Sequence, residues 1–247
     1  MVHRGAPLNG DSHVVENTRA AFRRAYGRGF RYFETDVRVT RDGVLVACHD
    51  QSLRRVAGDR VQIAKVTWAE LSEIRVGDEP LPRLVDLLDE YPDVSFNIDP
   101  KVDAAIRPLV SSILERDVLA RVCVASFSDE RLRWVRAALG PGVCTAAGPG
   151  ELRRAMLQIA RGQSLELPGV DVLQVPRWLT PRTPWPGSRG VDLLEAARRV
   201  DLPVHVWTVN DGAHMERLLA RGAGGVMSDD TDVLTEVFTA NGWRPRQ

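Results

Sequence analysis

Cysteine is scarce in this sequence. The 247 residues include only three cysteines, Cys48, Cys123 and Cys144, and these are too widely spaced to form a CxxC motif. An odd number of distant cysteines excludes a disulfide framework and is typical of a protein from a reducing compartment. Lysine is scarcer still: Lys65 and Lys101 are the two lysines among 33 basic residues, so the position of each is informative.

Long hydrophobic runs are also absent. No segment approaches the ~20 consecutive apolar residues of a membrane-spanning helix. The first residues, Met-Val-His-Arg-Gly, lack the apolar segment of a signal peptide. We therefore expect a cytoplasmic protein without stable membrane insertion, an expectation that a start site misplaced downstream of a leader would change.

The sequence has no net charge, because 33 Lys and Arg balance 33 Asp and Glu. Nucleic acids and anionic membranes attract clustered positive charge, so neither is expected as the main partner. A small anionic substrate held by a few local cations is compatible with this balance. The sequence leaves the oligomeric state open.

Short β-prone runs alternate with amphipathic helical patterns along the chain. Eight of each fit into 247 residues, which gives about 31 residues per unit, the size of a βα repeat. The expected strands are Val2–Gly5, Tyr32–Val39, Ser95–Ile98, Val122–Phe127, Val143–Ala147, Val170–Val175, Val204–Val209 and Gly225–Ser228. The expected helices are Asn17–Gly27, Leu84–Glu90, Ala104–Arg116, Asp129–Leu139, Gly150–Arg161, Asp192–Val200, Ala213–Ala220 and Asp232–Ala240.

This alternation predicts the fold class. Strands that alternate with helices form a parallel sheet, and eight such units predict an α/β protein made of a single (β/α)8 TIM barrel. An open doubly wound sheet is the alternative, although no GxGxxG motif follows any predicted strand.

Two stretches interrupt the repeat. Thr40–Asp50 contains an Asp42-Gly43 turn between β-prone runs, which predicts a hairpin that extends the second strand. Gln51–Pro82 then predicts a small capping insertion at the barrel mouth, within one domain that spans residues 1–247. Pro176–Gly190, with four prolines and two tryptophans, is either a lid or a surface loop packed on the barrel.

Acidic side chains end two neighbouring predicted strands. Glu34 and Asp36 lie two residues apart late in the second strand, and Asn97 and Asp99 share one face of the third. Inward-pointing residues near the carboxyl ends of barrel strands line the active site. Like charges so close together favour a bound cation, and oxygen donors favour Mg²⁺ or Ca²⁺. Paired acids also occur on solvated or salt-bridged faces, so this pattern alone leaves both interpretations open.

Two histidines are expected at the same rim. His3 ends the first strand and His49 ends the hairpin, and either one alone is typical of a structural histidine. Together they can flank a bound phosphate as general base and general acid. Arg4 and Lys101 are then placed to hold the phosphate oxygens.

A series of short motifs follows in order along nearly the whole chain. They are His3-Arg4-Gly5, Glu16-Asn17-Thr18, Glu34-Thr35-Asp36-Val37, Thr40-Arg41-Asp42-Gly43, His49-Asp50, Asn97-Ile98-Asp99-Pro100-Lys101, Trp207-Thr208-Val209-Asn210 and Gly225-Val226-Met227-Ser228-Asp229. Each motif is weakly specific, whereas their order and spacing are highly specific. Taken together, they resemble the glycerophosphodiester phosphodiesterase family.

The resemblance implies a TIM barrel that hydrolyses glycerophosphodiesters to glycerol phosphate and an alcohol, an activity of lipid metabolism. It implies one divalent cation, either Mg²⁺ or Ca²⁺, with Mn²⁺ as a further candidate. The implied metal ligands are Glu34, Asp36 and Asp99. The implied catalytic pair is His3 and His49, and the implied substrate-binding residues are Arg4, Lys101 and Trp207.

Several alternatives stay open beside this resemblance. The strand-three acid is commonly Glu in the family, so the shorter Asp99 implies a shifted metal or an added water ligand. The chemistry could instead be a phospholipase D-like reaction that gives a cyclic phosphate, as in spider-toxin enzymes, or a metal-independent phospholipase C of the phosphatidylinositol type. A non-catalytic phosphodiester-binding barrel is a further alternative. The roles of the two histidines and the identity of the alcohol are not assigned.

Overall fold

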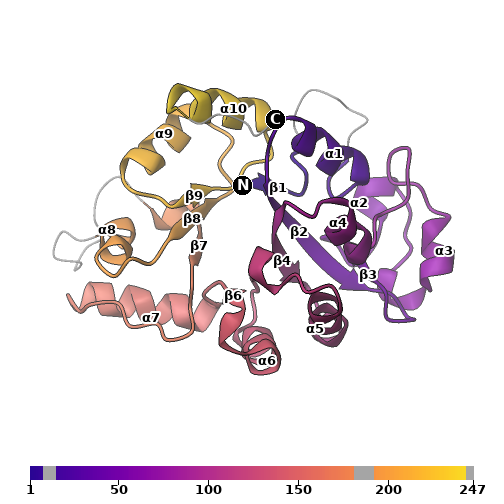
Figure 1. Ribbon diagram of the computed structural model, residues 1–247, viewed down its shortest axis with the longest axis horizontal. Coiled ribbons are helices and arrows are strands. Elements are labelled where there is room, and N and C mark those ends of the chain that lie inside the picture. The colour runs from indigo at the N-terminus through magenta and orange to yellow at the C-terminus, as the bar shows by residue number, and fades with distance from the viewer. Residues whose placement is uncertain (8–14, 181–191, 243–247) are drawn as a thin grey trace.

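The computed structural model describes residues 1–7, 15–180 and 192–242 (Figure 1). The strands are β1 (Val2–His3), β2 (Tyr32–Val39), β3 (Leu45–Ala47), β4 (Ser95–Pro100), β5 (Val122–Val124), β6 (Cys144–Thr145), β7 (Leu173–Pro176), β8 (Val204–Trp207) and β9 (Gly225–Val226). The helices are α1 (Arg19–Gly27), α2 (Arg54–Ala57), α3 (Trp68–Ser72), α4 (Leu84–Glu90), α5 (Ile106–Glu115), α6 (Asp129–Leu139), α7 (Pro149–Ala160), α8 (Leu193–Arg198), α9 (Gly212–Ala220) and α10 (Thr231–Ala240).

Eight parallel strands form a closed ring. Strands β1, β2, β4, β5 and β6 pair in that order, and β7, β8 and β9 form a second run of parallel pairs. Isolated parallel bridges join the two runs at both ends, between Val2 and Ser228 and between Ala146 and Val172. The helices surround the strands (Figure 1), and the predicted TIM barrel is confirmed.

Several helices begin one or two residues away from their predicted starts, and a capping residue precedes the observed start in α1 and α8. Helix α1 begins at Arg19, since the Thr18 side chain accepts a hydrogen bond from the amide of Ala21. In the same way the Asp192 side chain accepts from the amide of Glu195, so α8 begins at Leu193. Such caps satisfy amides that have no partner within the helix.

The alternation along β2 separates the apolar core from the barrel mouth. Phe33 lies in an aromatic cluster with Phe22 of α1, Phe96 of β4 and Tyr91, with ring centroids 5.4 to 5.8 Å from its own. Residues of opposite parity, such as Glu34, therefore point to the other face of the strand.

The segment after β2 has its own small core. Strand β3 pairs antiparallel with β2, so the predicted hairpin is confirmed, and Gly43 takes a φ of 88° in its turn. Helices α2 and α3 follow and pack on a separate cluster of buried apolar residues: Val46, Cys48, Leu53, Ile63, Leu71, Val76 and Leu81. Each is too short to be stable alone, so this core holds them on the barrel.

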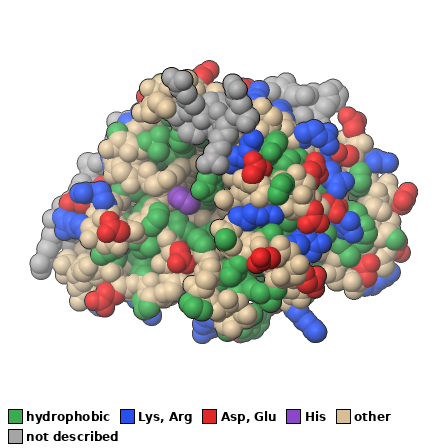
Figure 2. Space-filling model, viewed as in Figure 1, with side chains coloured by type: hydrophobic (Ala, Val, Ile, Leu, Met, Phe, Trp, Pro, Cys, Tyr) green, Lys and Arg blue, Asp and Glu red, His purple; other side chains and the backbone are tan. Residues whose placement is uncertain are grey.

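Acidic and basic side chains are interspersed on the face seen in Figure 2, in keeping with the balanced composition. No helix within the described ranges has the length and apolar character needed to cross a bilayer. Most of the predicted lid, from residue 181 onward, lies outside the described residues, whereas Trp178 is described and is 70% exposed.

Candidate active site

Strand register places the predicted polar residues side by side. His3 of β1 pairs with Glu34 of β2, and Glu34 pairs with Asn97 of β4. Two residues further along the same strands, Asp36 is opposite Asp99. In-register neighbours in a sheet lie about 5 Å apart, so the three predicted carboxylates occupy adjoining positions at one rim of the barrel.

Glu34 is a buried carboxylate with few stabilising contacts. Its Oε2 accepts a hydrogen bond from the Arg4 amide at 3.2 Å, and Nε2 of His3 lies 3.7 Å from the same oxygen. Burial, together with the negative charge of Asp36, raises the pKa of Glu34 to about 8. In the metal-free chain the site therefore favours a protonated Glu34 at neutral pH.

Asp36, in contrast, is held in its ionised form. Its Oδ1 lies 2.6 Å from the Lys101 ammonium, and its Oδ2 lies 2.8 Å from Nε of Arg4. Burial works against ionisation, but Lys101 and Arg4 outweigh it and lower the pKa of Asp36 below its usual range. The side-chain amide of Asn17 also donates to Oδ2, at 3.3 Å. Asp36 is therefore the ionised partner in a pair of buried acids.

Asp99 shares Lys101 with Asp36. The Lys101 ammonium donates to Oδ2 of Asp99 at 2.6 Å. Oδ1 of Asp99 is buried and has no hydrogen-bond partner. Burial outweighs the nearby ammonium and raises the pKa of Asp99. A buried carboxylate oxygen without a partner is costly, so this atom marks a place where a cation or a donor is needed.

His3 is oriented by a carboxylate from the far end of the chain. Its Nδ1 lies 2.5 Å from Oδ1 of Asp229, which directly follows Ser228, and Asn210 donates to the other Asp229 oxygen at 3.1 Å. Burial opposes protonation, but the charges of Glu34 and Asp229 outweigh it and raise the pKa of His3. The sequence motif contained Asp229 without assigning it a role.

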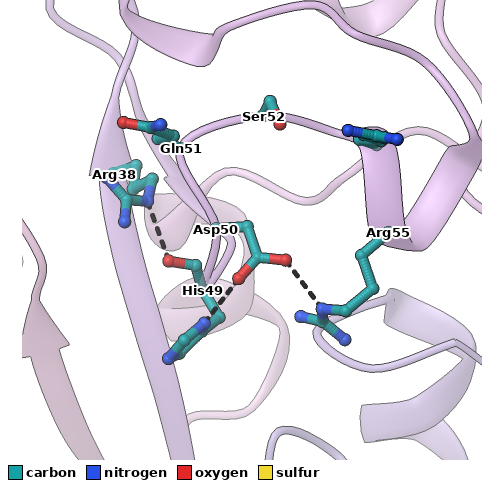
Figure 3. Close-up of a pocket in the computed structure, with 7 residues that line it drawn as sticks. Arg38, His49, Asp50, Gln51, Ser52 and Arg55 are labelled. Carbon is teal, nitrogen blue, oxygen red and sulfur yellow. Dashed lines mark hydrogen bonds and ion pairs between the residues drawn. The ribbon is translucent and has the colours of Figure 1, made fainter.

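His49 is oriented by a longer chain of charges (Figure 3). Its Nδ1 contacts Oδ1 of Asp50 at 2.7 Å, and Oδ2 of Asp50 accepts from Nε of Arg55 at 2.7 Å. Arg55 also binds Glu16, which contacts Nη1 of Arg4 at 3.3 Å. This network links the insertion to the barrel rim. The side chain of His49 is 38% exposed, and the backbone amide of the preceding Cys48 donates to the backbone oxygen of Asp36 at 2.9 Å.

Trp207 lies on an aromatic edge of the site. Its ring packs edge to face on Phe127, with centroids 5.8 Å apart, and the Lys101 ammonium lies 5.8 Å from the Phe127 ring. Phe127 is 67% exposed. The predicted run Val122–Phe127 contained this residue, but only the fold shows that it meets Trp207 from β8.

Asn17 is a further residue whose place the sequence did not reveal. It takes a φ of 59°, accepts a hydrogen bond from Thr35 at 2.9 Å and donates to Asp36. Its amide therefore fixes the Asp36 carboxylate from the β1–α1 loop. Asn17 was part of the motif Glu16-Asn17-Thr18, but the sequence did not indicate that its partner is Asp36.

Within the described ranges, no three His, Cys, Asp or Glu side chains are gathered closely enough to form a ready metal cage. Arg4 and Lys101 lie among the three carboxylates and neutralise two of them. The donor set is nevertheless chemically suited to a hard divalent cation: three buried carboxylates, one with an unpartnered oxygen.

The stability of the metal-free chain should depend on pH through Glu34. Its pKa is about 8 when folded and near 4.5 in the unfolded chain. Between these values the unfolded state has released a proton that the folded state retains, so the unfolding free energy falls as pH rises through this window. Glu34→Gln removes the titrating group and with it this fall in the unfolding free energy. In EDTA, thermal unfolding should show the variant gaining stability relative to wild type between pH 5 and pH 8; an equal difference at both values would contradict the assignment.

Comparison with known proteins identifies the family. Residues 3–233 match the Glycerophosphoryl diester phosphodiesterase family. A Mycobacterium tuberculosis protein named "Probable glycerophosphodiester phosphodiesterase 2" is 32% identical, over 98% of this chain and 91% of its own length. The crystal structure of glycerophosphodiester phosphodiesterase from Agrobacterium tumefaciens matches with a TM-score of 0.76 and 22% identity, over 96% of this chain and 97% of that one.

A third relative was solved with a bound product. This Oleispira antarctica phosphodiesterase, in complex with the product sn-glycerol-3-phosphate, matches with a TM-score of 0.72 and 20% identity, over 98% of this chain and 97% of that one. The fold is thus shared with enzymes of one class, and the family matches nearly the whole sequence. The chain therefore belongs to the glycerophosphoryl diester phosphodiesterase family and is an enzyme of that family.

Proposed function

We propose that this enzyme hydrolyses glycerophosphodiesters to glycerol phosphate and an alcohol, with a divalent cation at Glu34, Asp36 and Asp99 and with His3 and His49 as its acid–base pair. The observation that carries the proposal is the adjoining placement of three buried carboxylates on β2 and β4. The imidazole of His3 lies near Glu34, and His49 follows Cys48, whose amide donates to the backbone oxygen of Asp36. The names of the relatives support the substrate class.

The carboxylates are the proposed ligands of the cation. Burial keeps water from screening their charges, and Oδ1 of Asp99 has no partner of its own. Mg²⁺ or Ca²⁺ fits a set of oxygen donors without sulfur or nitrogen, and Mn²⁺ is a further candidate. When bound, such a cation supplies Lewis-acid stabilisation of the charge that develops on the phosphate.

Arg4 and Lys101 are proposed to bind the phosphate oxygens. Both lie against Asp36, where they now neutralise its charge. An arriving phosphodiester presents the same kind of acceptor, so these cations can bind phosphate while staying near the carboxylate. Trp207 and Phe127 lie beside Lys101 and form an apolar boundary for the substrate.

The two histidines are proposed to move the protons. In each ring Nδ1 contacts a carboxylate, Asp229 for His3 and Asp50 for His49. These contacts leave both Nε2 atoms for proton transfer. One neutral imidazole accepts a proton from the attacking water, whose oxygen bonds to phosphorus, and one protonated imidazole donates to the leaving alkoxide as its P–O bond breaks.

Product analysis tests this proposal. A panel of glycerophosphodiesters with choline, ethanolamine, inositol and glycerol head groups should give glycerol phosphate in ³¹P NMR spectra recorded with Mg²⁺, Ca²⁺ or Mn²⁺. A cyclic phosphate as the first product would instead support the phospholipase D-like route. Absence of turnover across the panel and with lysophospholipids would reject the proposal in favour of a binding protein.

Asp99→Glu tests the proposed role of Asp99, on β4, as a metal ligand. Because the family position commonly carries Glu, the longer side chain should be tolerated and should tighten metal binding by a few-fold. Titration calorimetry with Mn²⁺ and the metal dependence of kcat measure this effect. Complete inactivation by Glu would mean that the pocket is built around the shorter side chain. The matched variant Asp99→Asn should weaken metal binding in either case.

A further inference from the structure

A cavity of about 540 Å³ lies beside His49, on the side of the insertion (Figure 3). Its lining includes three arginines, Arg38, Arg54 and Arg55, against a single carboxylate, Asp50. In Figure 3, His49 and Asp50 lie between Arg38 and Arg55. The cavity therefore adjoins His49, one member of the proposed acid–base pair, and carries an excess of positive charge.

Arg55 is neutralised by direct ion pairs, whereas the charge of Arg38 is balanced only at longer range, by Asp50, Asp36 and Asp99. Arg55 forms ion pairs with Asp50 and Glu16. Arg38 donates through Nε to the backbone oxygen of His49 at 2.8 Å, and among the described residues no carboxylate lies within ion-pair distance of it. Its terminal NH₂ groups thus remain available on a half-buried side chain. A guanidinium group in this state favours a planar or tetrahedral anion.

Arg38 lies on the same strand as two of the proposed metal ligands, close to where the substrate phosphate is expected. It follows Glu34 and Asp36 on β2 at intervals of two residues, so all three side chains share one face of the strand. The Cα atoms of Asp36 and Arg38 are about 7 Å apart by strand geometry, the scale of a small head group. The glycerol half of the substrate carries no charge of its own, so an anion bound at Arg38 would belong to the alcohol half.

We propose that Arg38 and this cavity bind a second anionic group on the substrate, a phosphate or a carboxylate carried by the leaving alcohol. The enzyme then selects glycerophosphodiesters with anionic head groups. This inference rests on the proposed function, because it places the scissile phosphate between the carboxylates and the two histidines.

Two substrate pairs test the proposal, each differing by one anionic group. Glycerophosphoserine differs from glycerophosphoethanolamine by a carboxylate, and glycerophosphoinositol 4-phosphate differs from glycerophosphoinositol by a phosphate. Wild type should prefer the anionic member of at least one pair by about 10-fold or more in kcat/KM, the scale of one charge-assisted hydrogen bond. The pair that shows the preference identifies the anion. No preference in either pair overturns the proposal.

Variants of Arg38 locate the source of the preference. Arg38→Gln should bring the ratio of kcat/KM within a pair close to one, and Arg38→Lys should retain part of it. Arg41→Gln is the matched control: Arg41 pairs with Glu70 on an exposed turn outside the cavity, and its loss removes the same charge. If Arg38→Gln slows both members of a pair equally, Arg38 only supports His49, and the proposal is wrong.

Binding without turnover separates this proposal from the proposed function. Calorimetric titration of the whole protein with glycerophosphoinositol 4-phosphate in EDTA should give weaker binding for Arg38→Gln than for wild type and Arg41→Gln. That result without turnover of any diester would retain the anion pocket and reject the hydrolytic function. Turnover with ratios near one in both pairs would retain hydrolysis and reject the pocket.

Discussion

Glu34→Gln is expected to lower kcat by at least ~10³-fold and to abolish binding of the divalent cation, because it removes one of three proposed ligands and the Lewis-acid contribution that depends on them. Asp36→Asn should have a comparable effect. Glu34 gives the cleaner test, since Asp36 also holds Arg4 and Lys101 in place. Calorimetric titration with Mn²⁺ and steady-state rates measure the two losses separately.

A distant carboxylate provides the control for this experiment. Glu195 lies on α8, is half-buried and pairs with Arg199. Glu195→Gln should bind metal and turn over substrate as wild type does. Circular dichroism should show all three variants folded. If Glu34→Gln retained wild-type turnover in EDTA, the carboxylates would have no metal-binding part in the reaction.

Replacing His3 or His49 by Asn should lower kcat by at least ~10²-fold on an unactivated glycerophosphodiester, the usual scale of proton-transfer catalysis. The pH–rate profile of wild type should be bell-shaped near neutrality, with limbs that belong to the coupled pair. The raised pKa of His3 suits it to carry a proton at neutral pH, which favours His3 as the general acid.

An activated leaving group assigns the two roles. Bis(p-nitrophenyl) phosphate releases a stable phenolate and needs little acid assistance. It should rescue the variant of the general acid, which we expect to be His3→Asn, and not that of the base. His214→Asn is a suitable control because this histidine belongs to helix α9 and to neither the β1 nor the β3 rim segment that carries the proposed pair. Near wild-type kcat in both His3→Asn and His49→Asn would make the acid–base assignment wrong.

The placement of the carboxylates could be predicted from the sequence because it depends on local alternation. Glu34 and Asp36 lie two residues apart on one strand, and a strand places such residues on the same face. Their approach to Asp99 needs only parallel pairing of consecutive βα units. The fold class follows from the same repeat, and cap residues account for the differences of two residues at the start of α1 and one at the start of α8.

The supporting contacts could not be predicted because they depend on closure of the barrel and on the insertion. Asp229 reaches His3 across 226 positions in sequence, through the bridge between β1 and Ser228. Arg55 reaches Glu16 from the insertion. Lys101 lies on two carboxylates, a contact that depends on three-dimensional register, and its binding of phosphate stays a prediction.

The most direct test of the central claim is the rate of glycerol phosphate release from an unactivated glycerophosphodiester as a function of free divalent cation. The account predicts no release in EDTA, saturable recovery when Mg²⁺, Ca²⁺ or Mn²⁺ is restored, and no recovery in Glu34→Gln at any metal concentration tested. Undiminished release by wild type in EDTA would contradict it and would indicate metal-independent chemistry by the histidines.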